Sequence, residues 1–463
     1  MVNPITRCDV LWGYAASSLN IGAGLILLPV ILRYLPSEDV GLWFVFITLA
    51  SLAQLLEMGF QPTVARNAAY VYAGAQTLNK VGLPSKASSS GQINKSLLDA
   101  LVNAARCIYQ VVAFMAALVL LLAGTYYIST LLTLSQDHPS SLLAWVAFAS
   151  GYVVNFYYGY INGLLQGRGD VTQANKVIIL SRSLLILLGS AAVALGFGLV
   201  GLGIASLISA VAGRIAAYRF FYILYSPSKA FDKNEGDDLV SNLLKMMWHN
   251  ASRLGAVQIG AFFIQRGNTL IASSFLGLAA AASYGMTVTV LMALSGIAMV
   301  ICQVQVPHMN TLQSNGDKTA LISIFGEILL TSWLLFVTGL IALLLFGDNI
   351  LYLIGSSTYF LPSKILFLFG IIALLEMNHS IAGTYLTTTN KIPFVNAALF
   401  SGLGILVLAF LTINFFGVIG LILSQGLVQL VYNNWKWPLE ATKNLDSNFT
   451  KIIKMGALRV AGR

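Results

Sequence analysis

The sequence contains few charged residues. Lys, Arg, Asp and Glu make up 9% of its 463 residues, whereas 57% are hydrophobic. A soluble domain carries about 25% charged residues, so the composition excludes an ordinary soluble protein. The sequence also lacks the alternating segments of about ten residues that build a membrane β-barrel. Apolar runs of the roughly 20 residues that a spanning helix needs recur instead along the chain. We therefore predict an all-α polytopic membrane protein.

Catalytic and metal-binding patterns are also missing. The sequence contains no HExxH, GxSxG or GxxxxGK[ST] motif, and His249, His308 and His379 lack the spacing of metal ligands. The cysteines number only three, and small apolar fillers of helices are the simplest interpretation of them. We predict that the protein is not an enzyme and holds no cofactor or metal. The opening MVNPITRCDV does not resemble a cleaved signal peptide, so we expect the first span to direct targeting.

Charges and turn signals divide the apolar runs into about twelve predicted transmembrane helices. Their approximate limits are 10–34, 40–64, 98–126, 142–165, 173–196, 200–224, 247–276, 279–305, 319–346, 361–388, 392–414 and 417–437. An even number of spans places both termini on the same side of the membrane.

The basic residues predict which side this is. The segments on the side of the termini hold 20 Lys and Arg, the opposite segments hold two, and four lie within spans. Positive residues concentrate in cytoplasmic loops, so both termini are predicted to be cytoplasmic. The net charge of +9 is then a consequence of topology, and we predict no nucleic-acid partner.

A longer polar segment at 226–246 divides the spans into two sets of six. We predict a first six-helix bundle at 1–225, a cytoplasmic linker at 226–246, a second six-helix bundle at 247–440 and a cytoplasmic tail at 441–463. Paired bundles with a binding site between them are a common plan of transporters.

Polar residues recur at helical spacing within several spans. Asp99, Asn103, Arg106 and Gln110 follow the spacing i, i+4, i+7 and i+11, which places them on one face of a helix. Such stripes either line a cavity or join helices through hydrogen bonds. The residues that we predict to bind substrate are Arg106, Gln110, Asn155, Asn162, Arg182, Arg253, Gln258, Gln265 and Arg266.

Arg266 is the most unusual of these residues. It lies thirteen residues beyond Arg253, which is about 20 Å along a helix axis and close to the bilayer centre. A cation at that depth must face protein or water. It either lines a cavity or pairs with Glu57 or Glu376, whereas Arg106, Arg182 and Arg214 lie nearer the cytoplasmic ends, where a side chain can also reach the interface.

Three acidic residues, Glu57, Glu327 and Glu376, fall within predicted spans. Each either pairs with an arginine or carries a proton or an ion during transport, and the sequence leaves both alternatives open.

The segment GLWFVFITLASLAQLLEMGFQPTVARNAAY resembles the Wzx-type flippases of the multidrug/oligosaccharidyl-lipid/polysaccharide exporter superfamily. The resemblance rests on Gly41, Trp43, Glu57, Gly59 and Arg66, and RGNTLIASSFLGLAAAASYGMTVTV is similar to the junction of the seventh and eighth spans in that family. It covers nearly the whole chain and implies two helical bundles around a central cationic cavity.

The resemblance also implies a cargo and a location. The cargo would be an undecaprenyl-pyrophosphate-linked oligosaccharide, such as an O-antigen repeat unit. Alternating access, often driven by an ion gradient, would carry it from the cytoplasmic to the periplasmic leaflet of the bacterial inner membrane. Membrane lipid, a polysaccharide polymerase and a chain-length regulator are the other implied partners.

Two alternatives have different expectations. A drug exporter of the same superfamily should favour an acidic pocket over arginines. A membrane polysaccharide polymerase should carry a large outward loop with arginines, and the predicted outward loops are all short. A major-facilitator transporter should carry a GxxxDRxGRR-type second loop, where this chain has YAGAQTLNK.

Overall fold

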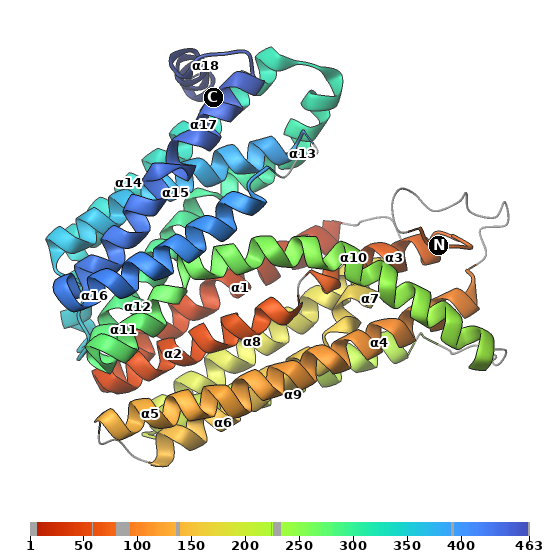
Figure 1. Ribbon diagram of the computed structural model, residues 1–463, viewed down its shortest axis with the longest axis horizontal. Helices are drawn as coiled ribbons and strands as arrows, with labels where there is room; N and C mark the ends of the chain where they lie inside the picture. Colours follow the sequence, from red (N-terminus) through yellow and green to blue (C-terminus); the bar gives the residue numbers. More distant parts are fainter. Residues whose placement is uncertain are drawn as a thin grey trace. The chain divides into compact units, whose positions relative to one another are not determined.

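The computed structural model describes residues 7–57, 59–79, 93–135, 139–223, 225, 233–389 and 393–461. Within these ranges the chain is helical and contains no strand (Figure 1). Two compact units are present: unit 1 comprises Met1–Leu35 and Phe46–Gln258, and unit 2 comprises Pro36–Val45 and Ile259–Arg463. The predicted all-helical membrane fold is therefore confirmed.

The helices divide between the units as follows. Unit 1 contains α1 (Arg7–Tyr34), the 3₁₀ turn η1 (Leu55–Glu57), α3 (Phe60–Tyr72), α4 (Lys95–Ala117), the π-helical segment η2 (Leu118–Gly124), α5 (Thr125–Ser135), α6 (Pro139–Tyr157), α7 (Tyr160–Arg168), α8 (Val171–Ala194) and α9 (Gly198–Tyr222). Unit 2 contains α11 (Gly267–Leu276), α12 (Leu278–Ala298), α13 (Val300–Asn315), α14 (Lys318–Ile354), α15 (Ser363–Thr387), α16 (Val395–Val431), α17 (Asn433–Asn444) and α18 (Phe449–Ala461). Helices α2 (Ser37–Gln54) and α10 (Lys233–Gln265) belong in part to each unit, and α10 begins inside the predicted linker.

Nine helical stretches of the described residues are long and apolar enough to cross a membrane. The predicted spans 142–165 and 247–276 are not among them. In the first, α6 gives way to α7 after Tyr157, and in the second, α10 gives way to α11 at Arg266. The last two predicted spans fall within one stretch, Val395–Asn444.

That last stretch folds back on itself within α16. Gly417 has the non-helical angles φ 55° and ψ −135°, in a region of φ that favours glycine. The hydroxyls of Thr412 and Ser424 lie 3.1 Å apart on either side of this break, and the Asn433 amide donates to Ser401 Oγ at 2.8 Å. A straight helix of 50 residues would be about 75 Å long, more than twice the thickness of the hydrocarbon core. The two arms therefore match the predicted spans 392–414 and 417–437.

Local signals in the sequence determine where several helices begin and end. Asn94 Oδ1 accepts a hydrogen bond from the backbone N–H of Leu97 and so caps α4. Asp317 caps α14 in the same way through the N–H of Ala320. Such caps satisfy backbone donors that the first turn of a helix leaves unpaired.

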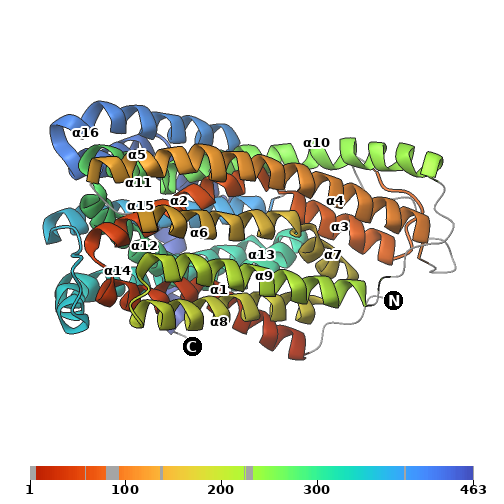
Figure 2. The same cartoon turned by 90° about the horizontal axis from the view of Figure 1, so that it is seen from below.

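Small residues allow the helices of each unit to pack closely. In unit 1, α6 lies against both α4 and α9 (Figures 1 and 2), and Gly203 of α9 meets the backbone of Ala144 so closely that a Cβ would overlap its carbonyl. In unit 2, Gly326 of α14 packs against Gly456 of α18. Close approach of backbones at small residues is typical of membrane helices. It also shows that the predicted tail contains a helix docked on unit 2.

Candidate functional site

A cluster of polar side chains lies within unit 1 around Glu57, where the second predicted span breaks. Glu57 ends η1, and Gly59 follows in the left-handed conformation at φ 89°. Tyr109 of α4 donates a hydrogen bond to Glu57 Oε1 at 2.6 Å, and Arg214 of α9 attracts the same carboxylate. Arg214 also donates to Asn155 Oδ1 of α6 at 2.9 Å. A predicted coupling acid and a predicted substrate ligand therefore belong to one network.

Arg214 is the member of this network that the sequence analysis did not place at a site. Its signal was present, because it is one of four basic residues within predicted spans. The guanidinium bridges α9 to α6 and compensates the charge of Glu57 from a third element. A partly buried carboxylate is stabilised by such compensation, so Arg214 helps to hold Glu57 in position.

Arg106 lies on an exposed face of α4. Its Nη2 donates to Tyr222 Oη at 2.8 Å, and Tyr222 Oη lies 3.2 Å from Tyr160 Oη. Gln110, one turn further, donates to Tyr157 Oη at 3.3 Å. Arg106 and Gln110 are both exposed in the structure. A guanidinium within a span must face water or protein rather than lipid. We therefore expect this face of α4 to border water, and we refer to it as the aqueous face.

Asp99 differs from its expected place in the same row. It is buried, and Tyr225, which follows α9, donates a hydrogen bond to it at 2.5 Å. The spacing i, i+4, i+7, i+11 defines a stripe, but Asp99 lies at the edge that packs inward. Burial, with the charge of Asp99 close by, raises the pKa of Tyr225 above its usual value, so this phenol remains a donor.

The other predicted ligands of unit 1 have different environments. Arg182 donates from Nε to Asn20 Oδ1 at 3.0 Å, which joins α8 to α1. Asn162 of α7 has a buried Oδ1 with no hydrogen-bond partner among the described residues. Gln258 is exposed. The side chain of Arg253 lies outside the described residues.

A row of tyrosines beside Arg106 was not predicted from the sequence. We define the tyrosine ladder as Tyr157, Tyr158, Tyr218, Tyr222 and Tyr225. Ring centroids along it are separated by 4.9 Å from Tyr157 to Tyr158, 6.5 Å from Tyr158 to Tyr218, 4.3 Å from Tyr218 to Tyr222 and 5.6 Å from Tyr222 to Tyr225. Residues 218, 222 and 225 follow the spacing i, i+4, i+7, a signal that could have identified the row.

In unit 2, two predicted residues line one cavity of about 230 Å³. Glu376 of α15 and Gln265 of α10 contribute to its wall together with Gln425, Ser295 and Ser380. The remaining lining is mostly apolar and includes methionines and a phenylalanine. Gln425 donates a hydrogen bond to Glu376 Oε1 at 2.9 Å. Glu376 is thus an acid in an apolar cavity that is held by an uncharged amide.

Arg266 lies at the junction of two helices rather than inside one. Its angles, φ −125° and ψ −26°, depart from helical values, and α11 begins at the next residue. Its backbone N–H still donates to the carbonyl of Phe262 at 2.7 Å, and its side chain is half-buried. Nearby Asn268 is buried, and its amide donates to the carbonyl of Leu421 at 3.2 Å.

Glu327, the third predicted coupling acid, has a structural partner. It is buried on α14, and Arg459 of α18 donates to its Oε2 at 2.6 Å. The pair lies beside the close contact of Gly326 with Gly456. This ion pair fastens α18 to α14, which is one of the two alternatives for Glu327, and its role in ion or proton coupling stays a prediction.

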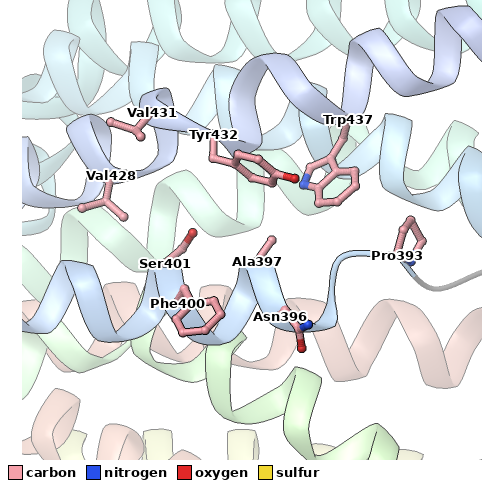
Figure 3. Close-up of a pocket in the computed structure, with 9 residues that line it drawn as sticks. All are labelled: Pro393, Asn396, Ala397, Phe400, Ser401, Val428, Val431, Tyr432 and Trp437. Atoms are coloured by element: carbon pink, nitrogen blue, oxygen red, sulfur yellow. The ribbon is translucent and has the colours of Figure 1, made fainter.

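A larger cavity of about 540 Å³ lies between the two arms of α16 and α17. Figure 3 shows Phe400 and Asn396 on one arm, facing Tyr432 and Trp437 across the space. Apolar side chains dominate the lining, and none of the described residues that form it is charged. Its size suits a small ligand.

Comparison with known proteins supports a transporter fold. Residues 8–313 match the family model described as "Polysaccharide biosynthesis protein". An inward-facing multidrug resistance MATE transporter of the MOP superfamily aligns with a TM-score of 0.66 and 12% identity over 95% of this chain and 99% of that chain. The lipid II flippase MurJ, in an inward closed conformation, aligns with a TM-score of 0.62 and 12% identity over 97% and 90%.

A MOP superfamily transporter from Pyrococcus furiosus, whose binding pocket is described as having reversed polarity, aligns with a TM-score of 0.53 and 15% identity over 95% of both chains. At these identities the three structures show a common fold alone. No curated protein matches the chain by sequence.

Proposed function

Because the chain belongs to the polysaccharide biosynthesis protein family, we propose that it is a flippase for a lipid-linked oligosaccharide. The cargo is an undecaprenyl-pyrophosphate-linked repeat unit, such as that of O-antigen. It moves from the cytoplasmic to the periplasmic leaflet of the bacterial inner membrane by alternating access. Both termini lie in the cytoplasm, and the protein performs no covalent chemistry.

The observation that carries this proposal is the exposed guanidinium of Arg106 within a membrane span. A cation within a span costs free energy. An anionic substrate that passes along the same face would offset that cost. A pyrophosphate is best met by guanidinium groups, which offer two parallel donors. Gln110 and the phenols beside Arg106 supply the donors and acceptors that sugar hydroxyls require.

The remaining basic residues extend the same chemistry. Arg182, Arg253 and Arg266 are proposed to meet the pyrophosphate or acidic sugars at other stages of transport, and Asn155, Asn162, Gln258 and Gln265 to meet hydroxyls. Asn162 supports this role because its buried carbonyl oxygen has no partner among the described residues. An acceptor left without a donor is costly unless a ligand or water completes it.

Glu57 and Glu376 are proposed to couple transport to an ion or proton gradient. Glu376 supports this proposal most directly, because it lines a cavity in which its bonded partner, Gln425, is uncharged. A cation or proton is needed to neutralise an acid in such surroundings. Glu57 differs from Glu376, because Arg214 attracts its carboxylate and compensates the negative charge when no ion or proton is bound.

Export of drugs is the second candidate function. The 230 Å³ cavity of unit 2 places one carboxylate among apolar side chains, and that combination suits an amphipathic organic cation. A drug exporter would use this cavity for its substrate, whereas the flippase would use it for coupling. The two functions therefore make different predictions for Arg106: the flippase needs its guanidinium to bind the pyrophosphate, whereas the drug exporter does not.

Transport in proteoliposomes tests the proposal. The purified protein is reconstituted with undecaprenyl-pyrophosphate-linked sugar, and transfer between leaflets is compared for wild type, Arg106→Ala and Arg106→Lys. Arg106→Ala should abolish transfer. Arg106→Lys should retain part of it, because lysine keeps the positive charge but lacks the two parallel N–H donors of the guanidinium. Arg33→Ala removes an exposed arginine at the end of α1 and is the control. Full transfer by Arg106→Ala, or transfer of cationic dyes alone, would contradict the proposal.

A further inference from the structure

The tyrosine ladder joins two helices on the aqueous face of unit 1. Tyr157 ends α6 and Tyr158 follows it, whereas Tyr218 and Tyr222 lie on α9. Their ring centroids follow one another at 4.9, 6.5 and 4.3 Å. Contacts between aromatic rings at 4.5–7 Å are favourable, so each ring helps to fix the orientation of the next.

Two hydrogen bonds connect this row to the expected aqueous face of α4. Tyr222 accepts from Arg106 and Tyr157 accepts from Gln110, and both donors are exposed. An exposed guanidinium within a span is costly in contact with hydrocarbon, so we infer that this face borders water. Tyr157 and Tyr218, which are 39% and 46% exposed, therefore present aromatic surface to an aqueous space.

Aromatic surface facing water is a binding surface for a ligand with a matching apolar face. Covering it is favourable by roughly 25 cal/mol per Å². A pyranose ring has such a face, formed by its axial C–H bonds, and a rim of hydroxyls that needs donors and acceptors. The phenol hydroxyls and the Gln110 amide lie at the edge of the ladder and supply them.

We propose that the tyrosine ladder is a stacking surface for the pyranose rings of the cargo, and that Tyr157 and Tyr218 are the residues that touch them. This inference rests on the proposed function and adds the class of group that the site selects. Arg106 lies beside the ladder and meets the anionic part of the same molecule. Sugar rings then bind by shape and surface, which tolerates many sugars, while the guanidinium requires the phosphate.

The arrangement also explains why several rings are needed. The exposed rings of Tyr157 and Tyr218 offer a sugar two surfaces of equal chemistry, so it can leave one ring as it meets the other. Tyr222 and Tyr158 are less exposed and contact Tyr218 from either side. They act as positioning residues that hold the Tyr218 ring at the surface.

Two probes separate stacking from phosphate binding. Proteoliposomes receive either undecaprenyl pyrophosphate or undecaprenyl pyrophosphate carrying one N-acetylglucosamine, and the ratio of the two transfer rates is measured. Wild type should favour the sugar-bearing probe. Tyr157→Ala and Tyr218→Ala should lower the ratio by about tenfold, whereas Tyr218→Phe, which keeps the ring, should preserve it.

Tyr126→Ala is the matched control, because Tyr126 is 73% exposed on α5 and does not belong to the ladder. It should leave the ratio unchanged. Monodisperse elution in detergent shows that each variant is folded.

Each other outcome has a defined meaning. If wild type transfers both probes and the alanine variants keep its ratio, or lose both rates equally, the ladder inference is overturned and the flippase proposal stands. Equal rates of the two probes in wild type would also overturn the ladder inference. If wild type transfers neither probe, the flippase proposal fails and the inference fails with it.

Discussion

Arg459 in the last helix donates a hydrogen bond of 2.6 Å to Glu327, a residue 132 positions earlier in the chain. Glu327 is almost fully buried, whereas the Arg459 side chain is 30% exposed. The two partners therefore differ in what their removal leaves behind. Arg459 can be hydrated when Glu327 is lost, but Glu327 cannot be hydrated when Arg459 is lost.

This asymmetry predicts an order of stability. Arg459→Ala should destabilise the folded protein by about 3 kcal/mol, because it removes the charged partner of a buried carboxylate. Glu327→Gln should cost less, and the double variant should recover part of the loss. Thermal unfolding of the purified protein in detergent measures these differences. Lys318→Ala breaks the exposed pair of Lys318 with Asp446 and should cost at most about 1 kcal/mol. Equal stability of Arg459→Ala and wild type would show that α18 is not held by this pair.

Arg266 is predicted to act in transport rather than in folding. Arg266→Ala should abolish export of surface glycan while the amount of protein in the membrane stays normal, and Arg266→Lys should retain part of the export. Glycan staining of cells and immunoblots of membranes measure the two quantities, with Arg33→Ala as the control. Full export by Arg266→Ala would refute the prediction. Loss of the protein, restored by Glu57→Gln or Glu376→Gln, would instead indicate a structural ion pair.

Cys107 provides a native reporter for the aqueous face of α4. It follows Arg106 directly, is exposed and forms no disulfide, whereas Cys302 is buried. In a Cys8→Ser background, a membrane-impermeant maleimide should label Cys107 and leave Cys302 unlabelled. Mass spectrometry of the labelled peptides distinguishes the two thiols. An inert Cys107, with labelling of a cysteine placed at an exposed loop position, would mean that this face of α4 contacts lipid.

Glu376 is predicted to couple transport to an ion gradient. Glu376→Gln keeps a group that can accept the hydrogen bond of Gln425 but removes the charge. Transfer of the lipid-linked sugar in proteoliposomes should then no longer respond to an imposed proton or sodium gradient, although transfer without a gradient persists. Glu38→Gln changes an exposed acid in the first turn of α2 and should keep the response. A normal response of Glu376→Gln would exclude Glu376 as the coupling group.

The predicted orientation can be checked with reporter fusions. The 20-to-2 distribution of basic residues predicts that both termini and the long polar segments lie in the cytoplasm. Reporters fused after residues 85, 232 and 445 should therefore all give a cytoplasmic signal. A periplasmic signal after residue 85 would contradict the assignment of spans.

The sequence by itself determined the class of the protein and the outline of its site. Low charge and recurrent apolar runs require membrane helices, because hydrocarbon admits few other structures. A basic residue within an apolar run is visible without any structure, so Arg106, Arg214 and Arg266 could be recognised as unusual. Helical spacing placed Arg106 and Gln110 on one face, as the structure has them.

Only the tertiary structure decided which polar groups meet. Glu57 and Tyr109 are 52 residues apart, and Glu327 and Arg459 are 132 apart, so no local pattern relates them. Helical spacing also could not place Asp99 inside the packing while its neighbours in the stripe remain exposed. The tyrosine ladder likewise joins Tyr157, at the end of α6, to Tyr218 and Tyr222 of α9; spacing relates the last two to each other but not to Tyr157. Periodicity defines the faces of one helix, whereas the packing of several helices determines which faces are buried, paired or left to water.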